Sequence, residues 1–298
     1  MIDSSFLKAF RMPSTRKLFV GLVVLALLLL LIFRFLLGDH DWPEIAGDIL
    51  ESLISTFVAA LGIAIFLRFF VPRDPGIEVN LIEPRDLQDE FPSLLQEAMS
   101  WKYKGNFGRY FRTSVLSVLS RRVNEKHIAV EVECMVIDPD NVKLCELHAS
   151  SRNAVRAADG KQDWTVRDVR VEVYATILCC FIYKNTLNIR LGLLNYFESP
   201  RFDISPESII ITREDKKAPA VKINKESYLF HAIVRDYHVA MSQSRVINLQ
   251  RNNLSLKEID HKKAAEILIG ADLDKDFINS EIKAICDQAA KKENPYTY

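Results

Sequence analysis

Two long apolar runs lie close together near the N-terminus. Residues 18–37 carry a single charge, Arg34, and residues 53–70 are almost wholly apolar. A helix rising about 1.5 Å per residue needs about 20 apolar residues to cross a hydrocarbon core of about 30 Å. A core helix rarely stays apolar on every face for this length, and a cleaved signal peptide has a shorter run. The pattern predicts a two-helix transmembrane hairpin over residues 18–73, after a basic cytoplasmic segment, residues 1–17.

The basic residues around these runs predict the orientation of the hairpin. Lysines and arginines precede the first run and close the second, whereas the loop between the runs has none. Because positive residues favour the cytoplasmic side, we expect both termini in the cytoplasm and two spans in the inner (plasma) membrane, in contact with lipid. A reducing compartment then keeps the five cysteines as thiols.

Three charged residues lie where lipid would oppose them. Arg34 is near the outer end of the first run, and Asp48 and Glu51 open the second. Their opposite signs favour a pair, within or between protomers, that sets the register of a homo-oligomer. The alternative is that each side chain reaches the outer headgroups by itself.

The remainder of the chain alternates strand and helix patterns. Strands are predicted at residues 77–82, 127–137, 188–197, 202–205, 208–212 and 220–223. Helices are predicted at residues 87–99 with a break at Pro92, 110–123, 142–158, 166–185, 227–244, 255–269 and 277–290. The helix at 255 begins with the capping-box spacing of Ser255 and Glu258.

This order of elements predicts a mixed α/β sheet covered on both faces. The expected fold class is a membrane-anchored α/β protein. Its parts are the transmembrane hairpin, a cytoplasmic mixed α/β domain over residues 77–250, and a C-terminal helical hairpin over residues 255–292.

Charge then restricts the partners. Lysine plus arginine and aspartate plus glutamate both number 39 in 298 residues, so any attraction to an anion is local. One basic and aromatic stretch ends in a GxxG turn that opens a helix, where backbone N–H groups and arginines can receive a phosphate. The candidate anion-binding residues are Lys104, Gly105, Gly108, Arg109 and Arg112. The alternative is a turn followed by a solvated helix face.

The same stretch carries a resemblance. Residues 101–112, with 136–139, 202–205 and 209–212, resemble the phospholipase-D-like domains of bacterial defence-associated proteins, over roughly residues 77–249. Catalysis in that superfamily needs H-x-K-x4-D. His261 has Lys263 but Leu268 in the place of the aspartate, and the other five histidines lack the lysine. The resemblance therefore implies a binding domain without phosphodiesterase activity.

Other reaction and cofactor motifs are missing as well. The sequence has no GxSxG, no HExxH and no cysteine–histidine metal spacing. The segment 272–283 starts like a calcium loop, but Phe277 replaces the required glycine and Lys283 the bidentate glutamate. We therefore predict no catalytic residues, no metal, no cofactor and no enzymatic activity.

The predicted layout resembles the two-span membrane effectors of bacterial anti-phage systems, including those that accompany retrons or nucleotide-signalling operons. That resemblance implies a toxic effector that permeabilises the inner membrane once its cytoplasmic sensor domain is triggered. The implied partners are a reverse transcriptase–nucleic-acid complex or a signalling nucleotide. Two alternatives are a membrane-anchored scaffold or sensor without pore activity and, less favoured, an anchored enzyme.

Overall fold

The computed structural model divides the chain into two compact units, Met1–Gly76 and Ile77–Tyr298. In the second unit it describes residues 79–157, 163–215 and 217–292. In the first unit it describes residues 21, 24–26, 28–29, 32, 52–59 and 61–62. Both segments predicted beyond residue 76, the α/β domain and the C-terminal hairpin, fall within the second unit.

The helices that are described correct the predicted membrane-anchored fold class. A span needs about 20 predominantly apolar residues in one helix. Helix α7 (Val166–Tyr183) has 18 residues, but Arg170 and Glu172 are among the four charges in its first half. No helix within the described residues is long and apolar enough to cross a membrane.

The predicted transmembrane hairpin, its inner-membrane location and its two spans are contradicted by this finding, and the fold class becomes a mixed α/β structure. The charges assigned to the hairpin, Arg34, Asp48 and Glu51, lie outside the described residues.

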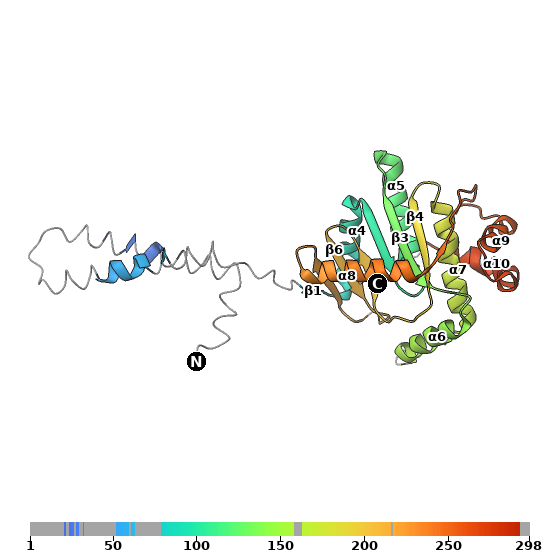
Figure 1. Cartoon of the computed structure of the whole chain (residues 1–298), viewed down its shortest axis with the longest axis horizontal. Coiled ribbons are helices and arrows are strands. Elements are labelled where there is room, and N and C mark those ends of the chain that lie inside the picture. Colours follow the sequence, from blue (N-terminus) through green and yellow to red (C-terminus); the bar gives the residue numbers. More distant parts are fainter. Residues whose placement is uncertain are drawn as a thin grey trace, which may run out of the picture. The chain divides into compact units, whose positions relative to one another are not determined.

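The second unit is built on an eight-stranded mixed sheet with the order β1-β7-β6-β5-β2-β3-β4-β8 (Figure 1). Its strands are β1 (Val79–Ile82), β2 (Ser100–Lys104), β3 (Glu131–Ile137), β4 (Asn188–Leu194), β5 (Arg201–Ile204), β6 (Ser208–Thr212), β7 (Ala220–Asn224) and β8 (Arg245–Ile247). Strands β2, β3 and β4 are parallel neighbours, and the other pairs are antiparallel. Helices join the parallel strands; the sequence predicted these helices and the strands β3 and β4, but it did not predict β2.

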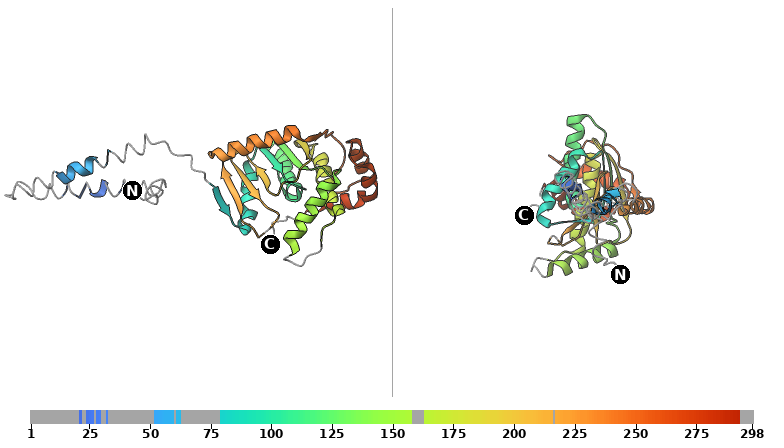
Figure 2. Two further views of the ribbon diagram at one scale, coloured as in Figure 1. Left: turned by 60° about the horizontal axis from the view of Figure 1, so that its bottom comes forward. Right: turned by 90° about the vertical axis from the view of Figure 1, so that its left-hand side faces the viewer.

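Helices cover both faces of this sheet, because its strands present apolar side chains on each side. The remaining helical elements are η1 (Pro84–Asp86), α4 (Leu87–Glu97), η2 (Phe111–Val115), α5 (Leu116–Lys126), α6 (Val142–Arg156), α8 (Tyr228–Gln243), α9 (His261–Gly270) and α10 (Lys275–Ala290). Helix α8 lies alone across one face, as Figure 2 shows, over a small core that includes Met135 and Tyr237. The larger core, with Trp101 and Val132, faces α4, α5 and α7.

The C-terminal helices α9 and α10 form a hairpin that packs on the outside of α7 (Figure 1). Phe277 of α10 stacks on Tyr174 of α7, with ring centroids 5.4 Å apart. Because the sheet, α5, α6 and α10 surround α7, every residue from Val169 to Ile182 is buried. In the segment predicted as a helical hairpin, residues 255–292, the helices are α9 and α10.

Four local predictions need correction. Pro92 lies inside α4 without breaking it, because its neighbours Phe91 and Leu95 are buried in the core. His127 adopts a left-handed conformation (φ 51°) that ends α5, so β3 starts later than predicted. The last hairpin begins at α9, because Asp260 accepts hydrogen bonds from the N–H groups of Lys262 and Lys263. Ser255 forms an isolated β-bridge with Glu258, and strands β2 and β8 were not predicted.

Candidate functional site

The conformation of the loop after β2 requires glycine at two positions, Gly105 and Gly108. A Cβ on Gly105 would lie 2.3 Å from the Tyr103 hydroxyl, and Gly108 has φ +67°, which side chains disfavour. The carbonyl of Gly108 accepts a hydrogen bond from the Arg112 N–H at 2.9 Å, which starts the helix. Both predicted glycines thus shape the turn from which Arg109 and Arg112 project.

The helix that follows opens with a π-helical turn, η2, before α5. Single π turns inside α-helices are frequent at functional sites. Here the turn aims Arg109 and Arg112 at one residue of α7, Glu172. Arg109 bonds to Oε1 of Glu172, and the Nη2 of Arg112 donates to Oε2 at 2.5 Å. The two predicted arginines therefore do converge on an anion, and the anion is supplied by the protein itself.

The two arginines differ in their access to solvent. The Arg112 side chain is 1% exposed and also donates to the Glu172 carbonyl (3.3 Å) and to the Thr176 hydroxyl (3.2 Å). The Arg109 side chain is 30% exposed. Arg112 is thus a fixed member of the core, whereas Arg109 remains accessible to a ligand.

Glu172 is the centre of the cluster. It lies almost completely buried, and its Oε1 also accepts a hydrogen bond from Nε2 of Gln288 at 2.7 Å. Burial by itself would raise the pKa of this carboxyl, but the charges and hydrogen bonds of Arg112 and Arg109 together bring the pKa below its usual value. Glu172 is therefore an ionised, acceptor-only group that joins η2, α7 and α10.

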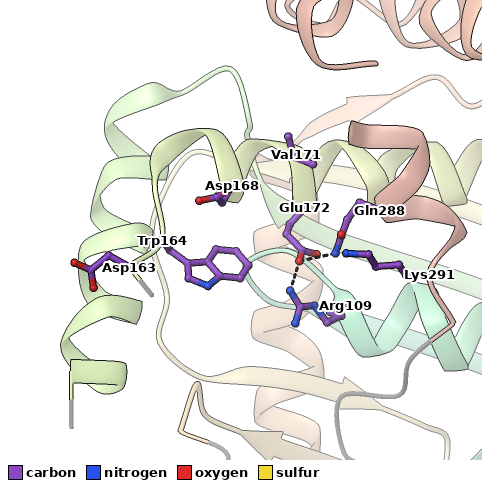
Figure 3. A pocket seen from close by; sticks show the side chains of 8 residues that line it. All are labelled: Arg109, Asp163, Trp164, Asp168, Val171, Glu172, Gln288 and Lys291. Carbon is purple, nitrogen blue, oxygen red and sulfur yellow. Dashed lines mark hydrogen bonds and ion pairs between the residues drawn. The ribbon is translucent and has the colours of Figure 1, made fainter. Parts of the chain in front are cut away.

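A cleft of about 300 Å³ opens beside Glu172 (Figure 3). It is lined by Arg109, Asp163, Trp164, Asp168, Val171, Glu172, Gln288 and Lys291. Figure 3 shows the side chains of Gln288 and Lys291 pointing from the end of α10 toward Glu172. We call Arg109, Arg112, Glu172, Gln288 and Lys291 the Glu172 cluster.

The two other acids of the cleft are directed elsewhere. Asp168 accepts hydrogen bonds from the backbone N–H and the hydroxyl of Thr165, as the capping box of α7. Asp163 points away from the cleft in Figure 3. The cleft lining thus carries three carboxylates, those of Asp163, Asp168 and Glu172, and two cations, Arg109 and Lys291, and Glu172 is the carboxylate that pairs with Arg109.

Trp164 forms an aromatic wall of the cleft. Its ring stacks on Phe107 at 5.6 Å between centroids, and the Arg152 guanidinium lies 4.0 Å from the ring centre. Arg109 lies 5.6 Å from the same ring. Rings and guanidinium planes packed in this way fix the indole, and with it the position of Arg109.

Lys104 does not join this cluster. Side chains alternate along a strand, and Lys104 points to the face of the sheet opposite Tyr103. There its Nζ lies 2.5 Å from a carboxylate oxygen of Glu198 and over the rings of Tyr196 and Phe202. Of the predicted anion-binding side chains, the structure brings Arg109 and Arg112 together and leaves Lys104 apart.

Sequence reasoning missed Glu172, Trp164, Gln288 and Lys291. A signal existed for Glu172, because a charged residue between Val171 and Val173 in a helix that is otherwise buried must find a cation. No such signal existed for Gln288 and Lys291. They reach the cleft only because α10 packs on α7.

No protein-family model matches the chain, and comparison with curated proteins gives no match. The chemistry of the site must therefore be argued from its own geometry. Within the described ranges, no three histidine, cysteine, aspartate or glutamate side chains gather in a way that would hold a metal ion. What the Glu172 cluster offers is an accessible guanidinium and an ammonium group beside an aromatic ring, which suits an oxyanion.

Proposed function

We propose that the mixed α/β unit is a sensor domain that binds a small phosphorylated ligand of the nucleotide class in the cleft at Arg109, without chemical conversion of the ligand. The observation that carries this proposal is the Arg109 guanidinium, 30% exposed in a cleft that Lys291 and the Trp164 ring also line. The buried Arg112 pairs with the same carboxylate as Arg109, so Glu172 does not balance the charge of Arg109 by itself. A guanidinium that keeps free N–H groups and part of its charge can bind an oxyanion.

The place of the cleft in the fold supports the same proposal. Arg109 follows β2, and α7 starts at the same end of the parallel strands, so the cleft lies at their carboxyl ends. Open α/β sheets bind ligands at this edge. A volume of about 300 Å³ is at the lower end for small-molecule sites, about 300–1,000 Å³, and suits a mononucleotide better than a larger molecule.

Each part of such a ligand has a counterpart in the cleft. Arg109 can bind phosphate oxygens through two parallel N–H groups, and Lys291 adds a point charge. The Trp164 ring, which neighbours Arg109, provides the apolar wall for a nucleoside. Glu172 would hold Arg109 in place before the ligand arrives.

Only the sensor part of the predicted effector function is carried into this proposal. The permeabilising step depended on two membrane spans, which the described helices contradict. The homo-oligomer predicted from Arg34, Asp48 and Glu51 and the reverse transcriptase complex implied by the resemblance remain predictions.

The test is a calorimetric titration of the full chain with adenosine 5′-monophosphate and, separately, with inorganic phosphate. We expect Arg109→Gln, which keeps a donor for Glu172, to weaken binding of the nucleotide about tenfold or more, as expected for loss of a charge-assisted hydrogen bond of about 1.5–3 kcal/mol. The matched control is Arg121→Gln, since Arg121 lies on α5 with a side chain 65% exposed and away from the cleft.

Three results would contradict the proposal. In the first, the parent chain binds neither probe at millimolar concentration. In the second, the Arg109→Gln variant binds the nucleotide as tightly as the parent does. In the third, Arg109→Gln and Arg121→Gln lose equal amounts of nucleotide affinity. If phosphate binds as tightly as the nucleotide, the site takes an oxyanion alone and the nucleotide class is wrong.

A further inference from the structure

Part of the cleft comes from the far end of the sequence. Gln288, in the last turn of α10, donates to Glu172, and Lys291 follows directly after the helix. The remaining cleft residues belong to the η2 and α7 region. A ligand in the cleft therefore touches two elements whose contact depends on how α10 docks on α7.

Other polar contacts hold α10 on α7 without involving the cleft. Arg167 of α7 forms two hydrogen bonds with the Glu281 carboxylate, at 2.7 and 2.6 Å. Arg170 of α7 donates to Asp274, the N-cap of α10, at 2.6 Å. The hairpin thus has one attachment at Glu172 and separate attachments elsewhere, so the two kinds can be altered independently.

The attachment at Glu172 is shared. Oε1 accepts both from Arg109 and from Gln288, while Arg112 occupies Oε2. When a ligand oxyanion takes the Arg109 guanidinium, Gln288 becomes the side-chain donor left on Oε1. The same oxyanion lies within the cleft that Lys291 lines, so it draws the end of α10 toward η2.

From these contacts we infer that ligand binding at Arg109 tightens the docking of the α9–α10 hairpin on α7, with Gln288 and Lys291 as the ligand-linked residues of α10. This inference rests on the proposed function. It gives the sensor an output, because the stability of the hairpin then reports whether the cleft is occupied. Linkage requires the reverse effect too: weakening this attachment lowers ligand affinity.

Hydrogen–deuterium exchange of the full chain, with and without saturating adenosine 5′-monophosphate, tests the inference. The readout is the first half of α10, residues 275–282, which contacts Arg167 and Tyr174 and lies outside the cleft lining. We expect the nucleotide to slow exchange there about fivefold, the lower end of typical coupling between sites. The double variant Gln288→Ala with Lys291→Ala should lose most of this slowing.

The matched control is Glu281→Gln, which weakens docking without changing a cleft residue. It should exchange faster than the parent in the absence of nucleotide and still slow about fivefold when the nucleotide is added. Two results would overturn this inference and leave the proposed function intact. In the first, the parent binds the nucleotide but exchange in residues 275–282 does not slow; in the second, the double variant shows the full slowing. A parent chain that does not bind the nucleotide would instead remove the proposed function.

Discussion

Two charge clusters join the C-terminal hairpin to the rest of the second unit, and they are built differently. The Glu172 cluster has one carboxylate among three cations and borders a cleft. The second, which we call the Asp140 network, consists of Asp138, Asp140, Arg170, Tyr174, Arg245 and Asp274. Its carboxylates outnumber its cations, and no member lines the cleft.

The Asp140 network is closed. Each of its six carboxylate oxygens accepts at least one hydrogen bond, from Arg245, Arg170, the Tyr174 hydroxyl or the backbone N–H groups of the turn and of α10. A hydrogen-bond network whose acceptors are all satisfied in this way favours one geometry. The difference indicates that the Asp140 network stabilises the hairpin and that the Glu172 cluster has capacity left for a ligand.

The largest effect should come from removing the carboxylate of the Glu172 cluster. Glu172→Ala leaves the Arg112 guanidinium, 1% exposed, without its ion-pair partner. Breaking a buried pair from one side typically costs about 3–5 kcal/mol, and we expect urea unfolding to show a loss of this size. Asp163→Ala is the control, because Asp163 lines the same cleft but points away from it. A loss in urea unfolding no larger than that of the control would show that Glu172 and Arg112 do not form a buried ion pair.

The pH dependence of that loss has a defined direction. Because the folded pKa of Glu172 lies below its ordinary value of 4.5, its contribution is present above about pH 4.5 and disappears as the pH falls further. The difference in stability between parent and Glu172→Ala should therefore shrink in acid.

Asp203, a buried carboxyl outside both clusters, extends the comparison because it forms a hydrogen bond in place of an ion pair. Asp203 of β5 accepts a hydrogen bond from the Trp101 indole at 3.2 Å, and burial raises its pKa to about 7, against the lowering effects of Trp101 and Arg201. The folded state then keeps a proton that the unfolded state loses near pH 4. Stability therefore falls from about pH 4 to about pH 7.

Asp203→Asn should accordingly stabilise the chain by a few kcal/mol at pH 8 and by little at pH 4, as measured by thermal unfolding at both pH values. The amide oxygen can still accept from Trp101, so packing is preserved. An equal change at pH 4 and pH 8 would mean that Asp203 does not titrate in this range.

The smallest effect should come from trimming the closed network. Tyr174→Phe removes the hydroxyl that donates to Asp140 and should cost about 1 kcal/mol, the net contribution of one hydrogen bond. Oδ1 of Asp140 keeps the backbone N–H of Asp274 at 3.3 Å. Nucleotide affinity should remain that of the parent in the calorimetric titration. If Tyr174→Phe weakened nucleotide binding tenfold, the two clusters would not be separate in function.

Local pattern was sufficient for most elements of the second unit. The apolar spacing of residues 110–123 predicted the helix that appears as η2 and α5, and the β-branched run ending at Ile137 predicted β3. These two predictions were correct because the spacing of apolar residues along a short segment determines which of its faces is buried. The start of α9 was wrong because two capping signals competed, and the side chain of Asp260 supplied the stronger one.

The charge pattern was a weaker guide. Arg109 and Arg112 lie three residues apart on one helix, so their convergence was predictable, whereas the identity of the anion was not. Glu172 is separated from Arg112 by 60 positions. A pairing over that distance depends on how α7 packs on α5, which no local pattern encodes.

The sequence by itself determined most of the α/β order of the second unit, without β2 and β8, and also the glycine turn at residues 105–108 and the pair of arginines that follows it. These features depend on backbone preference and near neighbours. The tertiary structure alone decided that Arg112 is buried, that Lys104 points to the opposite face, and that Gln288 and Lys291 complete a cleft at Glu172. Burial and charge pairing are properties of packed elements, and an arginine in sequence carries the same charge whether a glutamate from another helix meets it or not.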